Sequence, residues 1–196
     1  MMIVIATDTR QRMVRSAALL FREQGYSGTG FRDVIEHSGA PRGSIYHHFP
    51  GGKAELAAAT AEWAGGVVER QIARAGRDGD PIAVLRGFVA GWREVLESSD
   101  FRAGCPIVAV AVESEAGPEA VAAAGHAFGR WQDLIAGTLR DAGVGRAEAR
   151  RLATLVVAAI EGAIVLSRAT RDLRPLRDVG RELEATLRAA LPADDS

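Results

Sequence analysis

Hydrogen-bond donors are concentrated in one short segment near the start of the chain, residues 42–47, which reads Arg-Gly-Ser-Ile-Tyr-His. A guanidinium matches the acceptor pair on a guanine edge, while hydroxyl and imidazole groups can donate to phosphate oxygens. Glycine and serine follow Arg42, so the segment carries donors with little bulk around them. These residue types at this spacing favour noncovalent recognition of a polyanion, with DNA as the first candidate.

Two short helices separated by a turn are predicted to position these donors. Phe31, Val34 and Ile35 share one face of the first helix, and Ile45 and Phe49 lie four residues apart on the second. Each helix is too short to be stable alone, so both must pack their apolar stripes on a larger element. With Ile45 and Phe49 facing inward, the outward side of the second helix carries residues 42, 43, 44, 46 and 47.

The residues between the two stripes specify the turn. Thr29 is expected to cap the first helix, Gly39 suits the left-handed residue that ends it, and Pro41 suits the first turn of the second helix. This arrangement is a helix-turn-helix, for which DNA binding is the leading interpretation. The alternative is an ordinary helical hairpin whose exposed face is only solvated.

The charge distribution favours the DNA interpretation. Residues 1–53 contain seven Lys and Arg against four Asp and Glu, together with three of the four histidines. The remaining residues contain 17 Lys and Arg against 21 Asp and Glu. A near-neutral chain therefore divides into a basic N-terminal part and an acidic body, as expected when one end of a protein meets a polyanion.

At these residues the chain resembles the TetR family of bacterial transcriptional regulators. Three segments carry the resemblance, and together they cover about the first quarter of the chain. They run from Thr9 through Ala17-Ala18-Leu19-Leu20-Phe21 to Tyr26, from Thr29 to Asp33, and over Gly43-Ser44-Ile45-Tyr46-His47-His48-Phe49. The link Pro50-Gly51-Gly52-Lys53, one residue longer than the family's commoner form, and the later segment Gly104-Cys105-Pro106-Ile107 resemble the subgroup of the lincomycin-resistance regulator.

The resemblance implies DNA-binding roles for eight residues. Arg42 is the best candidate for direct base readout. Gly43 departs from the larger residue that some members carry, so its expected contribution is close approach of the backbone. The implied positions are Thr29 and Tyr46 for phosphate contacts, His47 and Lys53 for backbone clamps, and Arg32, Arg42, Gly43 and Ser44 near base edges.

The whole chain is predicted to be all-α, with about nine helices. Prolines stand mostly where helices would begin or end, and no alternating β-branched run of strand length occurs. We expect residues 1–53 to form a three-helix DNA-binding domain and residues 54–196 a larger effector-binding and dimerisation domain. Helices are expected at residues 9–24, in the helix pair, and at 54–75, 81–99, 107–114, 119–142, 146–170 and 176–191.

The helix expected at residues 54–75 contains the pair Gly65-Gly66. Each glycine costs about 1 kcal/mol against alanine in a helix interior. One interpretation is close packing against another helix. The other is a soft point in the rod that joins the two domains.

A homodimer is predicted from the helix Arg146–Thr170, whose central turns are apolar on both faces. A surface helix of a monomer would have one polar face exposed to solvent. Burial of the second apolar face by another subunit is therefore the simplest explanation. The resemblance implies the same, through the last two main helices, Arg146–Thr170 and residues 176–191. Paired recognition helices require half-sites about 34–36 Å apart, so the expected partner is a palindromic operator in double-stranded DNA.

An effector pocket is predicted in the body, where aromatic residues stand among small ones. Such a pocket would accept a small apolar or aromatic molecule, and the alternative is that the rings are ordinary core. In the resembled subgroup the segment 107–114 borders the ligand cavity. The candidate residues are Trp63, Phe88, Trp92, Phe101, Cys105, Val108, Val112, Phe128, Trp131 and Glu161.

Polar groups that could orient the effector are expected at Glu113, His126 and Glu161, although each also suits a surface or an interface. Cys105 precedes Pro106 at a helix start, where a lowered thiol pKa would permit redox sensing. The alternative for a lone cysteine is a buried and inert thiol.

No enzymatic activity, cofactor or metal is predicted. The chain lacks Gly-x-Ser-x-Gly, a phosphate-binding glycine loop, His-Glu-x-x-His and Cys-rich metal spacing. The adjacent His47 and His48 are expected to point apart rather than bind one metal. The single cysteine excludes an internal disulfide, the start lacks the basic region of a signal peptide, and Glu161 interrupts the longest apolar run, so a soluble cytoplasmic protein with no membrane partner is expected.

The predicted function is a ligand-responsive repressor, released from its operator by the effector. One alternative is a DNA-binding regulator without an effector, constitutive or activating. Another is a helical small-molecule-binding module or enzyme that has lost DNA binding. Negligible, salt-independent affinity for promoter DNA would favour that last alternative.

Overall fold

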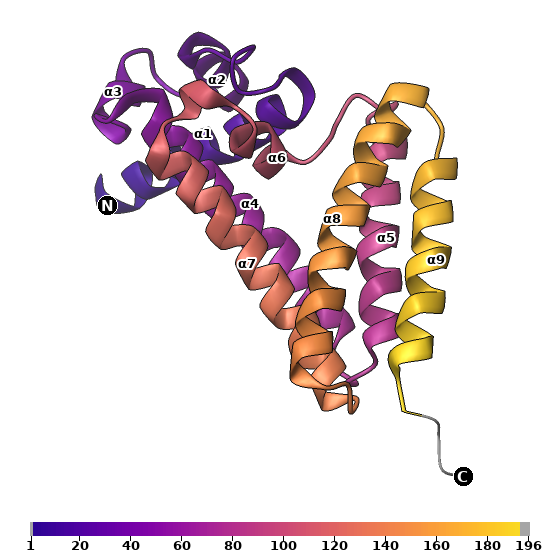
Figure 1. The fold of residues 1–196 in the computed structure, drawn as a ribbon. Helices are drawn as coiled ribbons and strands as arrows, with labels where there is room; N and C mark the ends of the chain where they lie inside the picture. Colours follow the sequence, from indigo (N-terminus) through magenta and orange to yellow (C-terminus); the bar gives the residue numbers. More distant parts are fainter. Residues whose placement is uncertain (1, 193–196) are drawn as a thin grey trace. The chain divides into compact units, whose positions relative to one another are not determined.

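The computed structural model describes residues 2–192, with side chains for residues 9–192. Over these residues the chain forms nine α-helices, one short 3-10 helix and no strand, which confirms the predicted all-α fold (Figure 1). The helices are α1 (Met2–Gln24), α2 (Phe31–Ser38), α3 (Ser44–His48), α4 (Gly52–Ala75), α5 (Pro81–Ser98), α6 (Pro106–Ala111), α7 (Pro118–Asp141), α8 (Arg146–Thr170) and α9 (Arg174–Ala190), with the 3-10 helix η1 (Ser114–Ala116) between α6 and α7.

Local capping explains where several helices begin and end. α8 has the predicted bounds. α5 begins at Pro81, because the side chain of Asp80 accepts a hydrogen bond of 2.7 Å from the backbone N–H of Ile82. α6 is shorter than predicted, since η1 and a glycine at positive φ, Gly117 at 82°, take the place of its last turn.

The chain divides into two compact units. These units do not correspond to the expected DNA-binding and effector domains, because their borders do not fall at Lys53. The domain boundary at Lys53 therefore stays a prediction. α4 continues without a break through Gly65 and Gly66, and the border between the units falls directly after that pair. Unit 1 comprises Met1–Gly66 and Cys105–Ala127, and unit 2 comprises Val67–Gly104 and Phe128–Ser196.

The core of unit 1 is built around α1, on which α2, α3 and α6 pack. The helix expected at residues 9–24 has a stripe of Met13, Ala17, Leu20 and Phe21; Met13, Ala17 and Phe21 are at most 1% exposed, whereas Leu20 is half-buried. The ring of Tyr26 lies 5.6 Å from that of Phe21. This packing supplies the stability that the two short helices of the helix-turn-helix lack alone.

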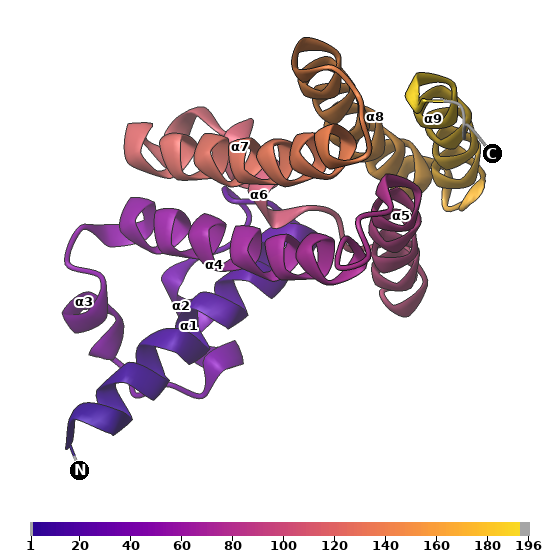
Figure 2. The same ribbon diagram turned by 90° about the horizontal axis from the view of Figure 1, so that it is seen from below.

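Unit 2 contains α5, α8 and α9 side by side (Figures 1 and 2). The three helices bury apolar residues between them, among them Leu85, Ile160 and Leu187. α5 and α9 approach closely at Gly180, where an added Cβ would lie 3.3 Å from a methyl group of Val89. These contacts fix α8, the helix predicted to meet a second subunit, on a rigid support.

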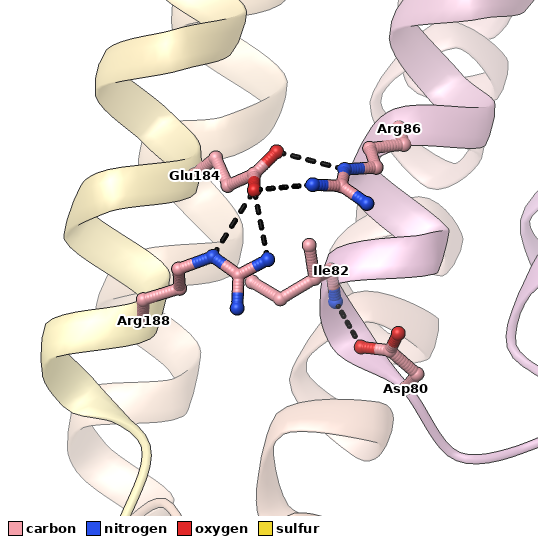
Figure 3. Close-up of polar contacts among 5 residues, drawn as sticks. All are labelled: Asp80, Ile82, Arg86, Glu184 and Arg188. Carbon is pink, nitrogen blue, oxygen red and sulfur yellow. Dashed lines mark hydrogen bonds and ion pairs between the residues drawn. The ribbon is translucent and has the colours of Figure 1, made fainter.

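An ion-pair network also joins α5 to α9 (Figure 3). Arg86 donates two hydrogen bonds to the carboxylate of Glu184, of 2.9 Å from Nε and 2.6 Å from Nη2. Arg188 donates two more to the same carboxylate, of 3.0 and 2.9 Å. The bonds from Arg86, and then those from Arg188, lower the pKa of Glu184 to about 2. The carboxylate is therefore ionised throughout the neutral range.

α8 leaves a row of apolar side chains exposed. Leu155, Val165 and Leu166 are 47%, 53% and 56% exposed. By length and composition this helix could cross a membrane, although half of its most apolar stretch of 18 residues is buried inside the structure. The expectation that Glu161 interrupts this run too much for a membrane-spanning composition is therefore wrong, because the apolar turns around this single charge outweigh it. A core helix meets the same criterion, so the observation does not identify a membrane span.

Candidate nucleic-acid interface

The start of α2 is set by Gly30 and not by Thr29. The backbone N–H of Gly30 donates to the carboxylate of Asp33 at 2.7 Å, which caps the helix from its third position. Thr29 is 1% exposed, and its hydroxyl donates to the carbonyl of Gly25 at 2.9 Å. The expectation that Thr29 caps α2 is therefore wrong, because its hydroxyl is turned back toward the end of α1.

The turn is longer than predicted, and two glycines make it. Gly39 ends α2 in the left-handed conformation (φ 63°), as predicted. The backbone N–H of the following residue closes the helix with a bond of 3.2 Å to the carbonyl of Ile35. Gly43 is also left-handed (φ 83°), and α3 begins only at Ser44. Pro41 thus lies in the turn rather than in the first turn of α3, and the expected helix start is wrong.

α3 is held by its two buried residues. Ile45 and Phe49 are both 0% exposed, as the four-residue spacing predicted. The guanidinium of Arg10 on α1 lies 4.9 Å from the centre of the Phe49 ring. A helix of five residues anchored at both ends in this way presents its remaining side chains in one fixed orientation.

The outward side of α3 carries the predicted donors. Arg42, Tyr46 and His47 are exposed, with 67% of Tyr46 accessible. The Tyr46 ring packs edge-on against Phe31 of α2, with 5.5 Å between ring centres. Tyr46 is therefore largely exposed on a ring that this contact supports, which suits a phosphate contact.

A groove of about 930 Å³ lies along the outer sides of α2 and α3. Two arginines from different elements, Arg32 and Arg42, line it, and Glu36 is the acidic residue in its wall. The structure therefore brings together two of the residues predicted near base edges. Its full lining is Phe31, Arg32, Ile35, Glu36, Gly39, Ala40, Arg42 and Tyr46.

Two predicted contact residues have hydroxyls already engaged. Ser44 donates to the carbonyl of Pro41 at 2.6 Å, at the start of α3, and Thr29 donates to Gly25 as described. Each hydroxyl oxygen can still accept a hydrogen bond, but its hydrogen is already donated to a backbone carbonyl. At Gly43 an added Cβ would meet no atom within 4 Å, so its positive φ is what favours glycine there.

The adjacent histidines at the end of α3 touch, with 5.3 Å between the ring centres of His47 and His48. The expectation that they point apart is therefore wrong, because the end of a five-residue helix allows neighbouring rings to turn toward each other. Burial lowers the pKa of His48, and the charges of His47 and Arg10 lower it further. Among the residues with described side chains, no group of three His, Cys, Asp or Glu is placed to bind a metal.

Lys53, the predicted backbone clamp, follows the turn after α3. Its Nζ lies 4.1 Å above the centre of the Tyr26 ring. Burial lowers the pKa of Lys53, while Glu113, Glu115 and Asp33 raise it. The carboxylates of Glu113 and Glu115, in a distant segment, therefore act on a residue predicted to contact DNA, a feature that no sequence pattern indicated.

The predicted effector residues fall in both units and differ in burial. Trp131 is 0% exposed and packs edge-on against Phe88 and Phe128, so the buried rings of Trp131 and Phe88 act as core. Trp92 and Cys105 are also buried, Glu161 is 9% exposed, and Val112 is 77% exposed. Half-buried positions are held by Trp63 and Val108 in unit 1 and by Phe101 and Phe128 in unit 2.

Of the polar residues expected to orient an effector, Glu113 is half-buried and accepts a hydrogen bond from Ser27, whereas His126 is exposed. Unit 2 has one groove of about 540 Å³ whose walls include Arg140, Arg146 and Arg150, and another of about 260 Å³ between α5 and α9. Charged residues make up much of both linings, so neither groove is the apolar pocket predicted from the aromatic residues.

Comparison with known proteins agrees with this arrangement. Residues 14–60 match the family model described as bacterial regulatory proteins of the tetR family. Residues 81–182 match the model for the C-terminal domain of transcriptional regulators that are LmrA/YxaF-like.

Whole-chain relatives and solved structures extend the match. The HTH-type transcriptional regulator Rv0196 of Mycobacterium tuberculosis is 44% identical over 93% of this chain and 96% of that protein. LmrA of Bacillus subtilis is 33% identical over 86% of this chain and 91% of its own length. The crystal structure of regulatory protein TetR from Rhodobacter sphaeroides superposes with a TM-score of 0.79 at 28% identity, covering 89% of this chain and 96% of that one. The chain therefore belongs to the TetR family of DNA-binding transcriptional regulators, in the group with an LmrA/YxaF-like C-terminal domain.

Proposed function

We propose that this protein is a ligand-responsive repressor that acts in the cytoplasm and binds a palindromic operator as a homodimer. Its DNA-binding part is residues 1–53, and residues 54–196 carry dimerisation and effector response. The observation that carries the proposal is the exposed, donor-rich side of α3, held by two fully buried anchors. Because a TetR-type regulator recognises DNA through its helix-turn-helix, this side is the one that enters the major groove.

Arg42 and Arg32 supply base readout in this proposal. They line one groove from two elements, so both guanidiniums can reach base edges on the same face of a duplex. Gly43 and Ser44 lie beside Arg42 and admit close approach of the backbone. Phosphate contacts come from the remaining residues of the face, namely Tyr46, His47 and Lys53, and from Thr29. Because phosphate oxygens only accept, a contact from Thr29 requires its hydroxyl hydrogen, now donated to the carbonyl of Gly25, to turn toward the DNA.

Dimerisation uses α8 and α9. The exposed residues Leu155, Ala158, Gly162, Val165 and Ala169 recur three or four residues apart along α8, which places them in one stripe. A stripe with this spacing suits a helix that packs against its symmetry mate. Two copies joined in this way hold two recognition helices for the half-sites of a palindrome.

The effector is proposed to be a small apolar or aromatic molecule bound by the body. Support comes from Phe101 and Phe128 in unit 2, whose half-buried rings keep exposed area. Release from the operator requires only differential binding to two states, about 1–3 kcal/mol of coupling. α4 is the natural element to transmit it, since it runs through Gly65-Gly66 at the border between the units.

Replacing Arg42 with alanine tests base readout. We expect the affinity for the selected DNA to fall by about 1–3 kcal/mol, and discrimination at one base-pair position to be lost. The measurement is selection of DNA from a random-sequence library by the wild-type protein and the variant, followed by titration of the enriched duplex. Arg140→Ala, an exposed arginine of α7 in unit 2, provides the matched control.

The wild-type protein should enrich a palindromic sequence, and Arg140→Ala should enrich the same one. Failure of the wild-type protein to enrich any sequence would reject the proposed function. Enrichment of an identical sequence by Arg42→Ala, with unchanged affinity, would reject only the role of Arg42.

A further inference from the structure

An acidic segment of unit 1 lies against the DNA-binding helices. It comprises Glu113, Ser114 and Glu115 between α6 and α7, and we call it the acidic segment. The hydroxyl of Ser27 donates to the carboxylate of Glu113 at 2.7 Å, across 86 residues of sequence. The hydroxyl of Tyr26 donates to the backbone carbonyl of Glu115 at 3.2 Å. Two hydrogen bonds therefore tie this segment to the loop between α1 and α2.

Tyr26 connects the acidic segment to Lys53. Its hydroxyl is held by Glu115, while its ring face holds the ammonium group of Lys53 at 4.1 Å. Tyr26 is only 5% exposed, so it is held within the packing of unit 1. The ammonium group thus lies beside the acidic segment. Burial is the largest effect on the pKa of Lys53 and lowers it, while the charges of Glu113 and Glu115 oppose that shift.

The backbone also brings the segment close to the start of α4. Gly117 adopts φ 82°, and a Cβ added there would lie 3.5 Å from that of Ala54, the residue after Lys53. α6 packs on α1 at the other end of the segment. Both flanks of the acidic segment are therefore supported by the helices that carry the DNA-binding face.

We propose that Glu113 and Glu115 form a charge latch that competes with DNA phosphates for Lys53. With the latch in place, the two carboxylates attract the ammonium group through space and repel an approaching phosphate backbone. DNA affinity then depends on the position of the acidic segment. This inference rests on the proposed function, since it takes Lys53 to be a phosphate contact.

α7 begins at Pro118, separated from the segment only by Ala116 and Gly117, and its later part belongs to unit 2. A conformational change in unit 2 that displaces α7 would therefore also move the acidic segment, because the two are covalently connected. Displacing the segment would free Lys53 for phosphate, and restoring it would withdraw the ammonium group again.

The double variant Glu113→Gln and Glu115→Gln tests the latch. Glutamine keeps an oxygen that can accept the bond from Ser27 and removes only the charge. We expect DNA affinity to rise about two- to tenfold at low salt, and the gain to shrink as salt increases. Glu119→Gln is the matched control, because this exposed glutamate lies in the same unit but is not among the groups that act on Lys53.

Repeating the comparison on a Lys53→Met background separates the latch from general charge effects. On that background we expect the two glutamines to leave DNA affinity almost unchanged, a ratio of about one, because the cation for which carboxylate and phosphate compete is absent. A gain of the same size in Glu119→Gln, or an undiminished gain without Lys53, would overturn the proposal.

A second readout needs no DNA, because Lys53 is the only lysine in the chain. Acylation of its amine by an excess of an amine-reactive ester can be followed by mass spectrometry of the peptide that contains it. Loss of the two carboxylates should raise the neutral fraction of the amine, so the double variant should react faster than the wild-type protein and Glu119→Gln. Equal rates would overturn the latch even if DNA binding were normal, and absent DNA binding with a faster rate would reject the proposed function alone.

Discussion

Phe49→Ala is expected to abolish DNA binding by releasing α3 from unit 1. The Phe49 ring is 0% exposed at the end of a five-residue helix, with the guanidinium of Arg10 over one face. Removing a buried phenylalanine costs about 3–5 kcal/mol, which a helix this short cannot recover from its own hydrogen bonds. Hydrogen exchange resolved by segment should show α3 unprotected while α5, α8 and α9 in unit 2 keep their protection.

Phe49→Leu is the matched control, since it keeps most of the apolar volume and should retain both protection of α3 and much of the DNA affinity. Tyr46→Ala separates folding from binding, because this side chain is 67% exposed. It should leave α3 protected and still weaken DNA binding. An intact, protected α3 in Phe49→Ala would show that the anchors are not what fixes the recognition surface.

Trp131→Ala is expected to lower the unfolding free energy of unit 2 by about 3–5 kcal/mol. Trp131 is fully buried, with ring centres 5.9 Å from Phe88 and 5.4 Å from Phe128. Truncation removes both edge-on contacts and leaves a large cavity. Chemical denaturation followed by circular dichroism measures the loss, since α5, α8 and α9 make up much of the helical signal.

The same variant decides between core and pocket for this residue. Trp131→Phe keeps an aromatic ring and should lose markedly less stability than Trp131→Ala. If Trp131 instead lined an open effector cavity, truncation would cost little. A change within about 0.5 kcal/mol, the range typical of surface substitutions, would contradict the packing described here.

The fold could be predicted from sequence because its signals are local and repeated. The four-residue spacing of Ile45 and Phe49 placed both in the core. Gly39 marked the left-handed end of α2, and the bounds of α8 follow from its apolar period. Periodicity and capping carry such information within a few residues of the position they describe.

The turn of the helix-turn-helix was harder to predict, because several local solutions compete. Pro41 fits the first turn of a helix, yet the chain uses Gly43 at positive φ and begins α3 later. Thr29 fits a cap, but the cap is Gly30, which uses the carboxylate of Asp33. The pattern of a cap residue followed three positions later by an acidic one was present in the sequence and could have identified it.

Contacts between distant segments were not predictable. Ser27 meets Glu113 and Tyr26 meets Glu115 across 86 and 89 residues, and no composition or period relates them. The aromatic residues show a related limit. Composition placed bulky rings among small residues, but only packing distinguishes Trp131, which is core, from Phe101, which keeps exposed area.

The central claim is that the outward side of α3 enters a groove of double-stranded DNA, and the salt dependence of binding tests it most directly. The affinity of the wild-type protein for its selected duplex should be measured at a series of salt concentrations. A dimer with about six to ten phosphate contacts should show a slope of about −5 to −9 in log affinity against log salt, and a loss of about 10³–10⁵ in affinity between roughly 50 and 200 mM. Negligible affinity, or affinity that does not change with salt, would contradict the account.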